Sequence, residues 1–108
     1  MPLDIESRVK MSCEPIESKF IATEDKGEVS SLLIRPVGAK WVMVLGHGAS
    51  TNMRHATLHT IAERLGDAGI ATFRYQFPYM ERGGGGRESQ PVALETVRSA
   101  VHAARCAA

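Results

Sequence analysis

The segment with the clearest chemical potential is 45–50, LGHGAS, which directly follows an apolar run. Small residues at Gly46 and Gly48 let the backbone turn sharply and bring its N–H groups close to a bound anion or carbonyl group. Ligands of open α/β sheets bind just outside the carboxyl ends of the strands. A His-Gly pair is a weak signal by itself, but in this setting it predicts a binding site made largely of backbone amides.

Two other histidines have a spacing that could indicate a metal site, but the evidence for one is weak. His55 and His59 are four residues apart and could share one helix face, as metal ligands do. The zincin pattern requires a glutamate directly after the first histidine, and Ala56 stands there. Because no third ligand is evident, we interpret both as surface histidines and expect neither a metal nor another cofactor.

The remaining polar and glycine-rich motifs have structural explanations. Ser50 or Asn52 is expected to cap the following helix, and Ser50 is a poorer candidate for a nucleophile. The run Gly83–Gly86 lacks the Lys-Ser/Thr of a phosphate-binding loop, so it predicts a flexible connector. The segment 77–80, FPYM, could line a substrate pocket or equally pack under the rim of the sheet.

Four strands are expected to position the 46–50 turn. Residues 16–24 alternate imperfectly, because Ser18 and Ile21 break the pattern, and residues 28–35 follow after a tight turn. These two strands predict an antiparallel hairpin. The run 40–46 is apolar on both faces, which is typical of a central strand covered on both sides. Residues 70–75 predict the fourth strand.

Two helices complete the pattern. Over residues 54–68 one apolar face is expected to be buried, and Gly69 is placed to end the helix in a left-handed cap. Pro91 opens the second helix. The residues expected to be buried are Leu58, Ile61, Ala62 and Leu65 in the first helix, and Leu94, Val97, Val101 and Ala104 in the second.

This order predicts an α/β fold in which an antiparallel hairpin leads into parallel strands, with helices on both faces of the sheet. Residues 1–15 are interpreted as a leader, disordered in part, and 16–108 as the folded region. The 44% hydrophobic and 23% charged residues are typical of a globular chain and not of a disordered one. A formal charge of +1, without basic clusters, gives no reason to expect nucleic acid as a partner.

The cellular setting is inferred from cysteines and apolar runs. Cys13 and Cys106 lie near opposite ends, so we expect free thiols in a reducing compartment. The first residues do not have the pattern of a signal peptide. The longest apolar run, Trp41–Leu45, is far too short to cross a bilayer. The expectation is a cytoplasmic protein without membrane contact.

Much of the chain resembles the α/β-hydrolase superfamily, specifically its small members similar to dienelactone hydrolase. The resemblance covers about residues 16–106 and includes the leading hairpin. It rests on the segments WVMVLGHGAS, ERLGDAGIA, FRYQFPYMERG and PVALETVRSAVHAA. The chain then corresponds to the amino-terminal half of such a domain, with hydrolysis of small ester or acyl substrates as the implied activity.

The resemblance also implies roles for individual residues. The residue after His-Gly, here Ala49, would donate its backbone N–H to an oxyanion hole, while His47 would hold the loop through a side-chain hydrogen bond. His47, Gly48, Ser50 and Tyr79 are candidates for the substrate pocket. No serine has glycines two residues away on both sides, so nucleophile, acid and base are expected outside this chain.

Two partner hypotheses and one other fold follow. The chain could associate with its missing half, which would allow an acyl substrate to bind, or it could act as a non-catalytic module that forms a homo-oligomer through an open sheet edge. A Rossmann-like nucleotide-binding domain fits less well, because Thr51 replaces the third glycine of Gly-x-Gly-x-x-Gly and the antiparallel hairpin is foreign to that fold.

Overall fold

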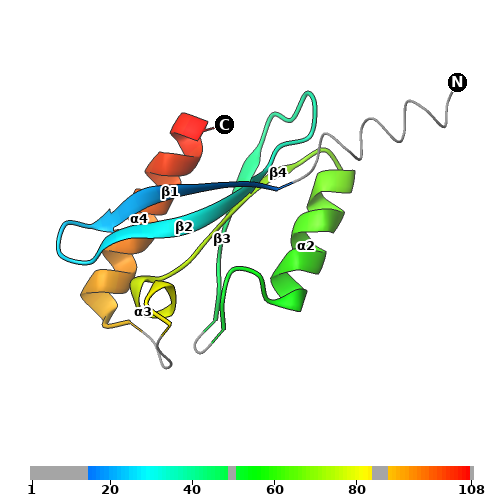
Figure 1. The fold of residues 1–108 in the computed structure, drawn as a ribbon. Coiled ribbons are helices and arrows are strands. Elements are labelled where there is room, and N and C mark those ends of the chain that lie inside the picture. Colours follow the sequence, from blue (N-terminus) through cyan, green and yellow to red (C-terminus); the bar gives the residue numbers. More distant parts are fainter. Residues whose placement is uncertain (1–14, 49–50, 84–87, 108) are drawn as a thin grey trace, which may run out of the picture.

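The computed structural model describes residues 15–48, 51–83 and 88–107, and within them it forms a four-stranded sheet in the order β1-β2-β4-β3 (Figure 1). The strands are β1 (Ile16–Thr23), β2 (Gly27–Ile34), β3 (Val42–Gly46) and β4 (Ala71–Tyr75). The helices are α2 (Ala56–Asp67), α3 (Pro78–Glu81) and α4 (Gln90–Ala107). The α/β order is confirmed, with α3 as an unpredicted addition. The expected leader falls almost wholly outside the described residues.

β1 and β2 form the predicted antiparallel hairpin, whose turn uses the positive φ of Gly27, +80°. Ser18 interrupts the apolar alternation because its hydroxyl lies 2.9 Å from the hydroxyl of Ser31, its cross-strand partner. Ile21, the other exception, is 55% exposed. Both breaks in the sequence pattern therefore have a local explanation.

The parallel pairing of β3 with β4 determines where the predicted turn lies. The pairing runs from Val42 opposite Ala71 to Gly46 opposite Tyr75, so the carboxyl ends of both strands meet at one rim of the sheet. On its other side β4 pairs antiparallel with β2. β3 is the last strand of the described sheet, and no described strand lies along its outer edge.

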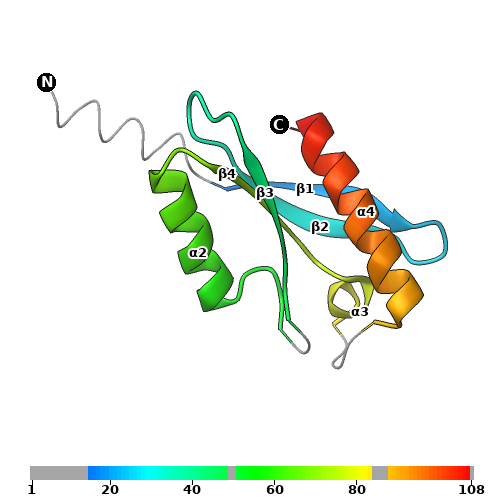
Figure 2. The ribbon, with the colours of Figure 1, turned by 180° about the vertical axis from the view of Figure 1, so that it is seen from behind.

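The two long helices cover opposite faces of the sheet. On one face Phe73 and Tyr75 pack with Ala100 and Ala104 of α4, which crosses β1 and β2 in the view of Figure 2. On the other face α2 packs against β4. No helix of the described residues is long and apolar enough to span a membrane.

The buried face of α4 matches the prediction at Ala104 and differs from it at the other three positions. Thr96, Ala100 and Ala104 are fully buried, whereas Leu94 is 50% exposed and Val97 is 38% exposed. Val101 is only partly buried. Small side chains face the sheet because the rings of Phe73 and Tyr75 already fill the space between sheet and helix. The larger apolar residues of α4 therefore remain at the surface.

The predicted burial was also wrong in part for α2 and β3. In α2, Ala62 is buried as expected, Leu58 and Leu65 are partly buried, and Ile61 is 40% exposed. Gly69 takes the predicted left-handed conformation just after this helix, with a φ of +86°. β3 is half-buried rather than covered on both faces, because it is the edge strand.

Gly46 generates a testable prediction about packing at the rim. A Cβ atom at this position would lie 2.7 Å from the hydroxyl oxygen of Tyr75 and 3.2 Å from its Cζ. Gly46→Ala should therefore lower the free energy of unfolding by about 1–3 kcal/mol through overpacking. In a Tyr75→Phe background the cost should be smaller, because the closest atom is gone.

Urea unfolding of the wild type, both single variants and the double variant measures this coupling. Gly66→Ala is a matched control, since its Cβ would meet Ile34 at an ordinary 3.5 Å. Equal costs of Gly46→Ala in both backgrounds would show that the hydroxyl is not the obstacle.

Candidate functional site

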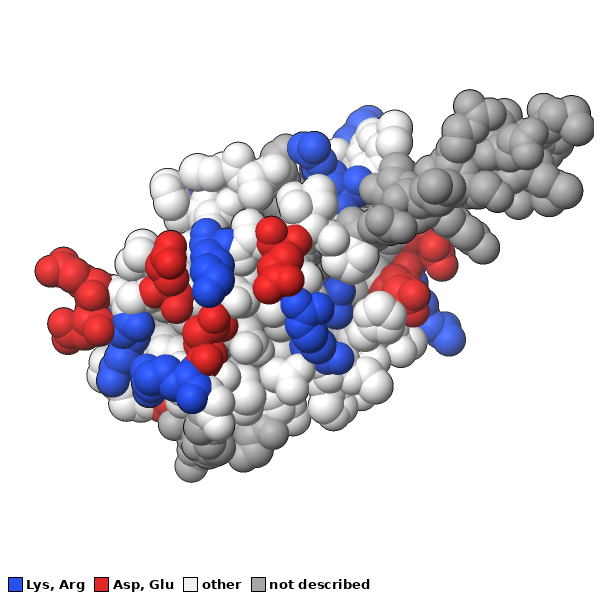
Figure 3. Space-filling model, in the orientation of Figure 1, with Lys and Arg blue, Asp and Glu red and all other residues white. Residues whose placement is uncertain are grey.

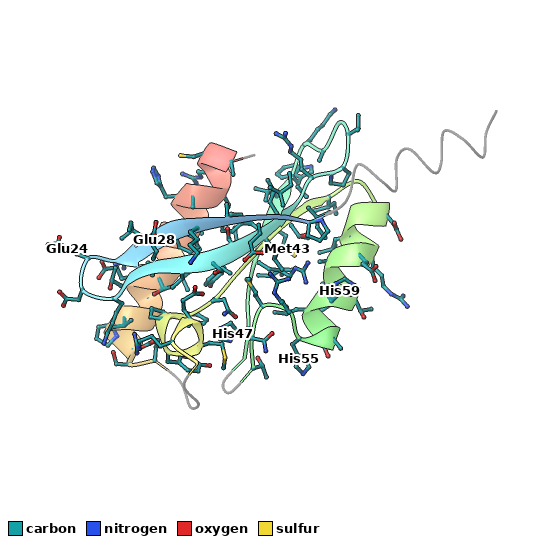
Figure 4. All side chains as sticks on the ribbon, viewed as in Figure 1. Glu24, Glu28, Met43, His47, His55 and His59 are labelled. Atoms are coloured by element: carbon teal, nitrogen blue, oxygen red, sulfur yellow. The ribbon has the colours of Figure 1, made fainter. Side chains whose placement is uncertain are left out.

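The candidate site lies where the chain leaves β3 and β4. Because Gly46 and Tyr75 are paired, residues 47–48 and 76–79 follow their strands at the same rim and lie against each other. Figure 4 shows His47 beside α3, while His59 lies in α2 and His55 lies just before it, on the other side of β3. The structure thus brings together His47, Gly48 and Tyr79 among the predicted site residues. Ala49 and Ser50 lie outside the described residues.

His47 is 7% exposed and uses both ring nitrogens to hold the two loops together. The backbone N–H of Phe77 donates to Nε2 at 3.0 Å, so Nε2 carries no proton. Nδ1 is then the protonated nitrogen and donates to the Gly48 carbonyl at 2.9 Å. Burial lowers the pKa of His47, although the hydrogen bond to Gly48 acts in the opposite direction. The geometry therefore requires a neutral imidazole.

Aromatic rings enclose this imidazole. The rings of Phe77 and Tyr79 approach His47 edge to face, with centroid distances of 5.0 and 5.7 Å. Pro78 and Tyr79 are buried, so α3 packs beneath the rim. This outcome matches one of the two alternatives for the segment 77–80. Whether Tyr79 also contacts a substrate stays a prediction.

The carbonyl oxygen of Gly48 is the acceptor on which the loop converges. Besides Nδ1 of His47, it accepts from the Thr51 hydroxyl at 2.8 Å, the Thr51 N–H at 3.2 Å and the Tyr79 hydroxyl at 3.3 Å. These donors come from the loop after β3 and from α3. The peptide plane that contains this carbonyl is consequently fixed from two directions.

Sequence reasoning missed a second set of contacts that positions the chain before α2. Gln76 and Arg74 bind the backbone of Met53 from one side of β4: Gln76 Oε1 accepts from the Met53 N–H at 3.0 Å, and Arg74 Nη1 donates to the Met53 carbonyl at 3.3 Å. Arg74 is 1% exposed, and burial, followed by the charge of Arg54, lowers its pKa against the opposing effect of Glu63.

Glu81 ties α3 to the hairpin. Its carboxylate accepts from the N–H and hydroxyl of Ser30 at 3.0 and 2.9 Å and lies 3.8 Å from Lys19. Burial would raise its pKa, but these bonds, one from Gln76 and the charge of Lys19 together lower it. Ser30 and Glu81 are 51 residues apart, so no motif in the sequence could have indicated the pair.

Predictions for the region around α2 have mixed outcomes. Asn52 does not cap the helix, because its side chain accepts from the nearby Arg54 N–H, and His55 occupies the N-cap and accepts from the Thr57 N–H. His59 is exposed and lies 3.5 Å from Glu63. In the described ranges no group of His, Cys, Asp or Glu could hold a metal ion.

Comparison with known proteins decides the family. Residues 39–107 match the family described as alpha/beta hydrolase domain. The chain belongs to the α/β-hydrolases. No curated protein matches the sequence significantly.

Solved α/β-hydrolases have the same fold at low sequence identity. The esterase Est22 superposes with a TM-score of 0.68 at 13% identity, covering 96% of this chain and 37% of its own. A lidless serine hydrolase from Xanthomonas campestris gives 0.66 at 16%, covering 86% and 45%. Dienelactone hydrolase from Anabaena variabilis gives 0.52 at 16%, covering 82% and 42%. This α/β-hydrolase chain therefore spans less than half the length of these proteins.

The neutral state of His47 generates a pH prediction. A second proton on Nε2 would oppose the Phe77 N–H, so the stability from this contact should be complete above about pH 6.5, the ordinary pKa of histidine. It should be lost as the pH falls from there through the lowered pKa of the folded state. Amide hydrogen exchange of Phe77, corrected for intrinsic rates, should show protection that decreases below pH 6.5.

The control is His59→Gln, which should keep this dependence because His59 is an exposed residue of α2 next to Glu63, apart from His47 in Figure 4. His47→Gln should remove it. Equal protection of Phe77 at pH 5 and pH 7.5 in the wild type would contradict the assigned protonation state.

Proposed function

We propose that this chain supplies the oxyanion-binding loop of an acyl hydrolase that acts on small esters, and that a Ser-Asp-His triad comes from polypeptide outside the chain. Esterases, a serine hydrolase and a dienelactone hydrolase share its fold. Attack on an ester places negative charge on the former carbonyl oxygen, and a preorganised N–H donor there lowers the barrier by roughly 3–4 kcal/mol. Such a loop is what this segment offers.

The observation that carries the proposal is the fixed carbonyl of Gly48. A trans peptide carries its N–H on the side opposite its C=O. Because His47, Thr51 and Tyr79 all hold the carbonyl within the protein, the N–H of the next residue is expected to face away from them. That N–H belongs to Ala49, the predicted oxyanion-hole donor, which lies outside the described residues.

The contacts of His47 favour a supporting role over that of a general base. A base needs a ring nitrogen free to take a proton from the nucleophile. Nε2 accepts from Phe77 and Nδ1–H donates to Gly48, so both positions are occupied. With no serine in a Gly-x-Ser-x-Gly setting, the chain by itself lacks a nucleophile of the family's kind.

The test is hydrolysis of p-nitrophenyl acetate by the natural polypeptide or complex that contains the nucleophile, compared with this chain alone. We expect turnover only from the complete protein, because the donor loop and the nucleophile must act together. Gly48→Pro in the complete protein should lower kcat by about 10²–10³-fold by displacing the donor amide. Background rates from the complete protein would overturn the proposal.

A second candidate function is self-association through the outer edge of β3. An unpaired strand edge is a template for another chain. An exposed apolar side chain accompanies it, because Met43 of β3 is 44% exposed. A second copy could pair edge to edge about a two-fold axis and cover Met43. The charged groups visible in Figure 3 are mixed in sign and offer no single-sign surface for a charged partner.

Light scattering of this chain at tens of micromolar tests the association. A dimer is expected, and Met43→Lys should shift it to monomer with an unchanged circular dichroism spectrum, because a charge at the edge opposes pairing. Lys40→Met is a control that adds no charge to the strand. A wild-type monomer that unfolds cooperatively would exclude this function.

A further inference from the structure

Tyr75 is the last residue of β4 and has a buried ring whose hydroxyl has no partner in the part of the chain that the structure describes. It is 3% exposed, and its ring packs edge to face with Phe20 at 6.2 Å and Phe77 at 5.3 Å. Among the described residues no hydrogen bond to its hydroxyl is found. Phenylalanine would fill the same space without a polar group to satisfy. Packing explains why an aromatic ring is present at this position, but it does not explain why the ring carries a hydroxyl.

The hydroxyl is directed at the edge of the sheet. Its oxygen lies 2.7 Å from the position that a Cβ of Gly46 would occupy, so the ring tip crosses the last residue of β3. Fully enclosed polar atoms without a partner in the described ranges are Thr72 Oγ1 and Arg74 Nε, and the Tyr75 hydroxyl is not one of them. The hydroxyl oxygen is therefore not fully enclosed, and it lies over Gly46 of β3, the last strand of the described sheet.

We propose that Tyr75 is a positioning residue whose hydroxyl donates a hydrogen bond to the backbone of the nucleophile-bearing turn in the complete hydrolase. The inference rests on the proposed function and adds to it that the strand before the nucleophile turn pairs in parallel with the outer edge of β3. Parallel strands end at a common rim, so the turn after that strand lies level with Gly46. The Tyr75 hydroxyl lies at this level, over Gly46 of the last described strand.

The chemistry of the nucleophile turn suits such a donor. In α/β-hydrolases the serine sits on a sharp, strained turn between strand and helix, and small displacements of reacting atoms are costly to rate. A hydroxyl on a ring fixed by two aromatic neighbours has little freedom, so a bond from it would restrain the turn. Glycine at position 46 leaves the space through which the hydroxyl reaches it.

Tyr75→Phe tests the inference in two settings. In the complete protein, kcat for p-nitrophenyl acetate should fall about tenfold with an unchanged KM, because the hydroxyl holds the nucleophile and does not touch the acyl group. In this chain alone, the urea midpoint should be unchanged, because the hydroxyl has no partner among the described residues. Tyr79→Phe is the matched control and should reduce amide protection of Thr51 in this chain, since its hydroxyl binds the Gly48 carbonyl.

Each outcome separates the two proposals. An active complete protein whose Tyr75→Phe variant keeps its kcat overturns the inference and leaves the proposed function standing. A raised KM at constant kcat assigns the hydroxyl to substrate and also overturns it. Destabilisation of this chain alone by Tyr75→Phe would show an internal partner. Absence of turnover in the wild-type complete protein overturns both proposals.

Discussion

The neutral imidazole of His47 is the contact on which the candidate site depends. It accepts a hydrogen bond from the loop after β4 and donates one to the loop after β3, so a single ring sets the distance between them. A charged imidazole could not accept from Phe77. Burial among aromatic rings keeps the ring neutral and at the same time fixes its orientation. The Gly48 carbonyl is held in place as a result.

Parallel pairing of β3 and β4 makes this contact possible. Two parallel strands have their carboxyl ends at the same rim of the sheet. The loops that follow them, 30 residues apart in sequence, therefore meet there. Gly46 lets the ring of Tyr75 cross the end of β3, and Gln76 binds the chain before α2. Backbone groups of the rim are thus held by side chains from β4 and the residues that follow it.

The chain covers only part of the fold of the compared hydrolases, which accounts for the apolar side chains at its surface. The chain spans 37–45% of the three hydrolases compared, and apolar side chains of β3 and α4, among them Met43 and Leu94, remain exposed. In a two-faced α/β sheet such residues are ordinarily covered. This arrangement accounts equally for completion by further polypeptide and for pairing of two copies, which compete for the same edge.

Local sequence patterns were sufficient to predict the order of the elements, the parallel pair of strands and the position of the turn after β3. Alternation, apolar runs and glycine conformations act within a few residues, so they can be recognised in the sequence. Gly69 and the hairpin are examples. The buried face of α4 was decided only by the folded structure, since the rings of Phe73 and Tyr75 leave room for alanine but not for leucine. The bond between Ser30 and Glu81 depended equally on the tertiary fold. Such contacts join residues far apart in sequence, and their geometry exists only after the sheet has brought them together.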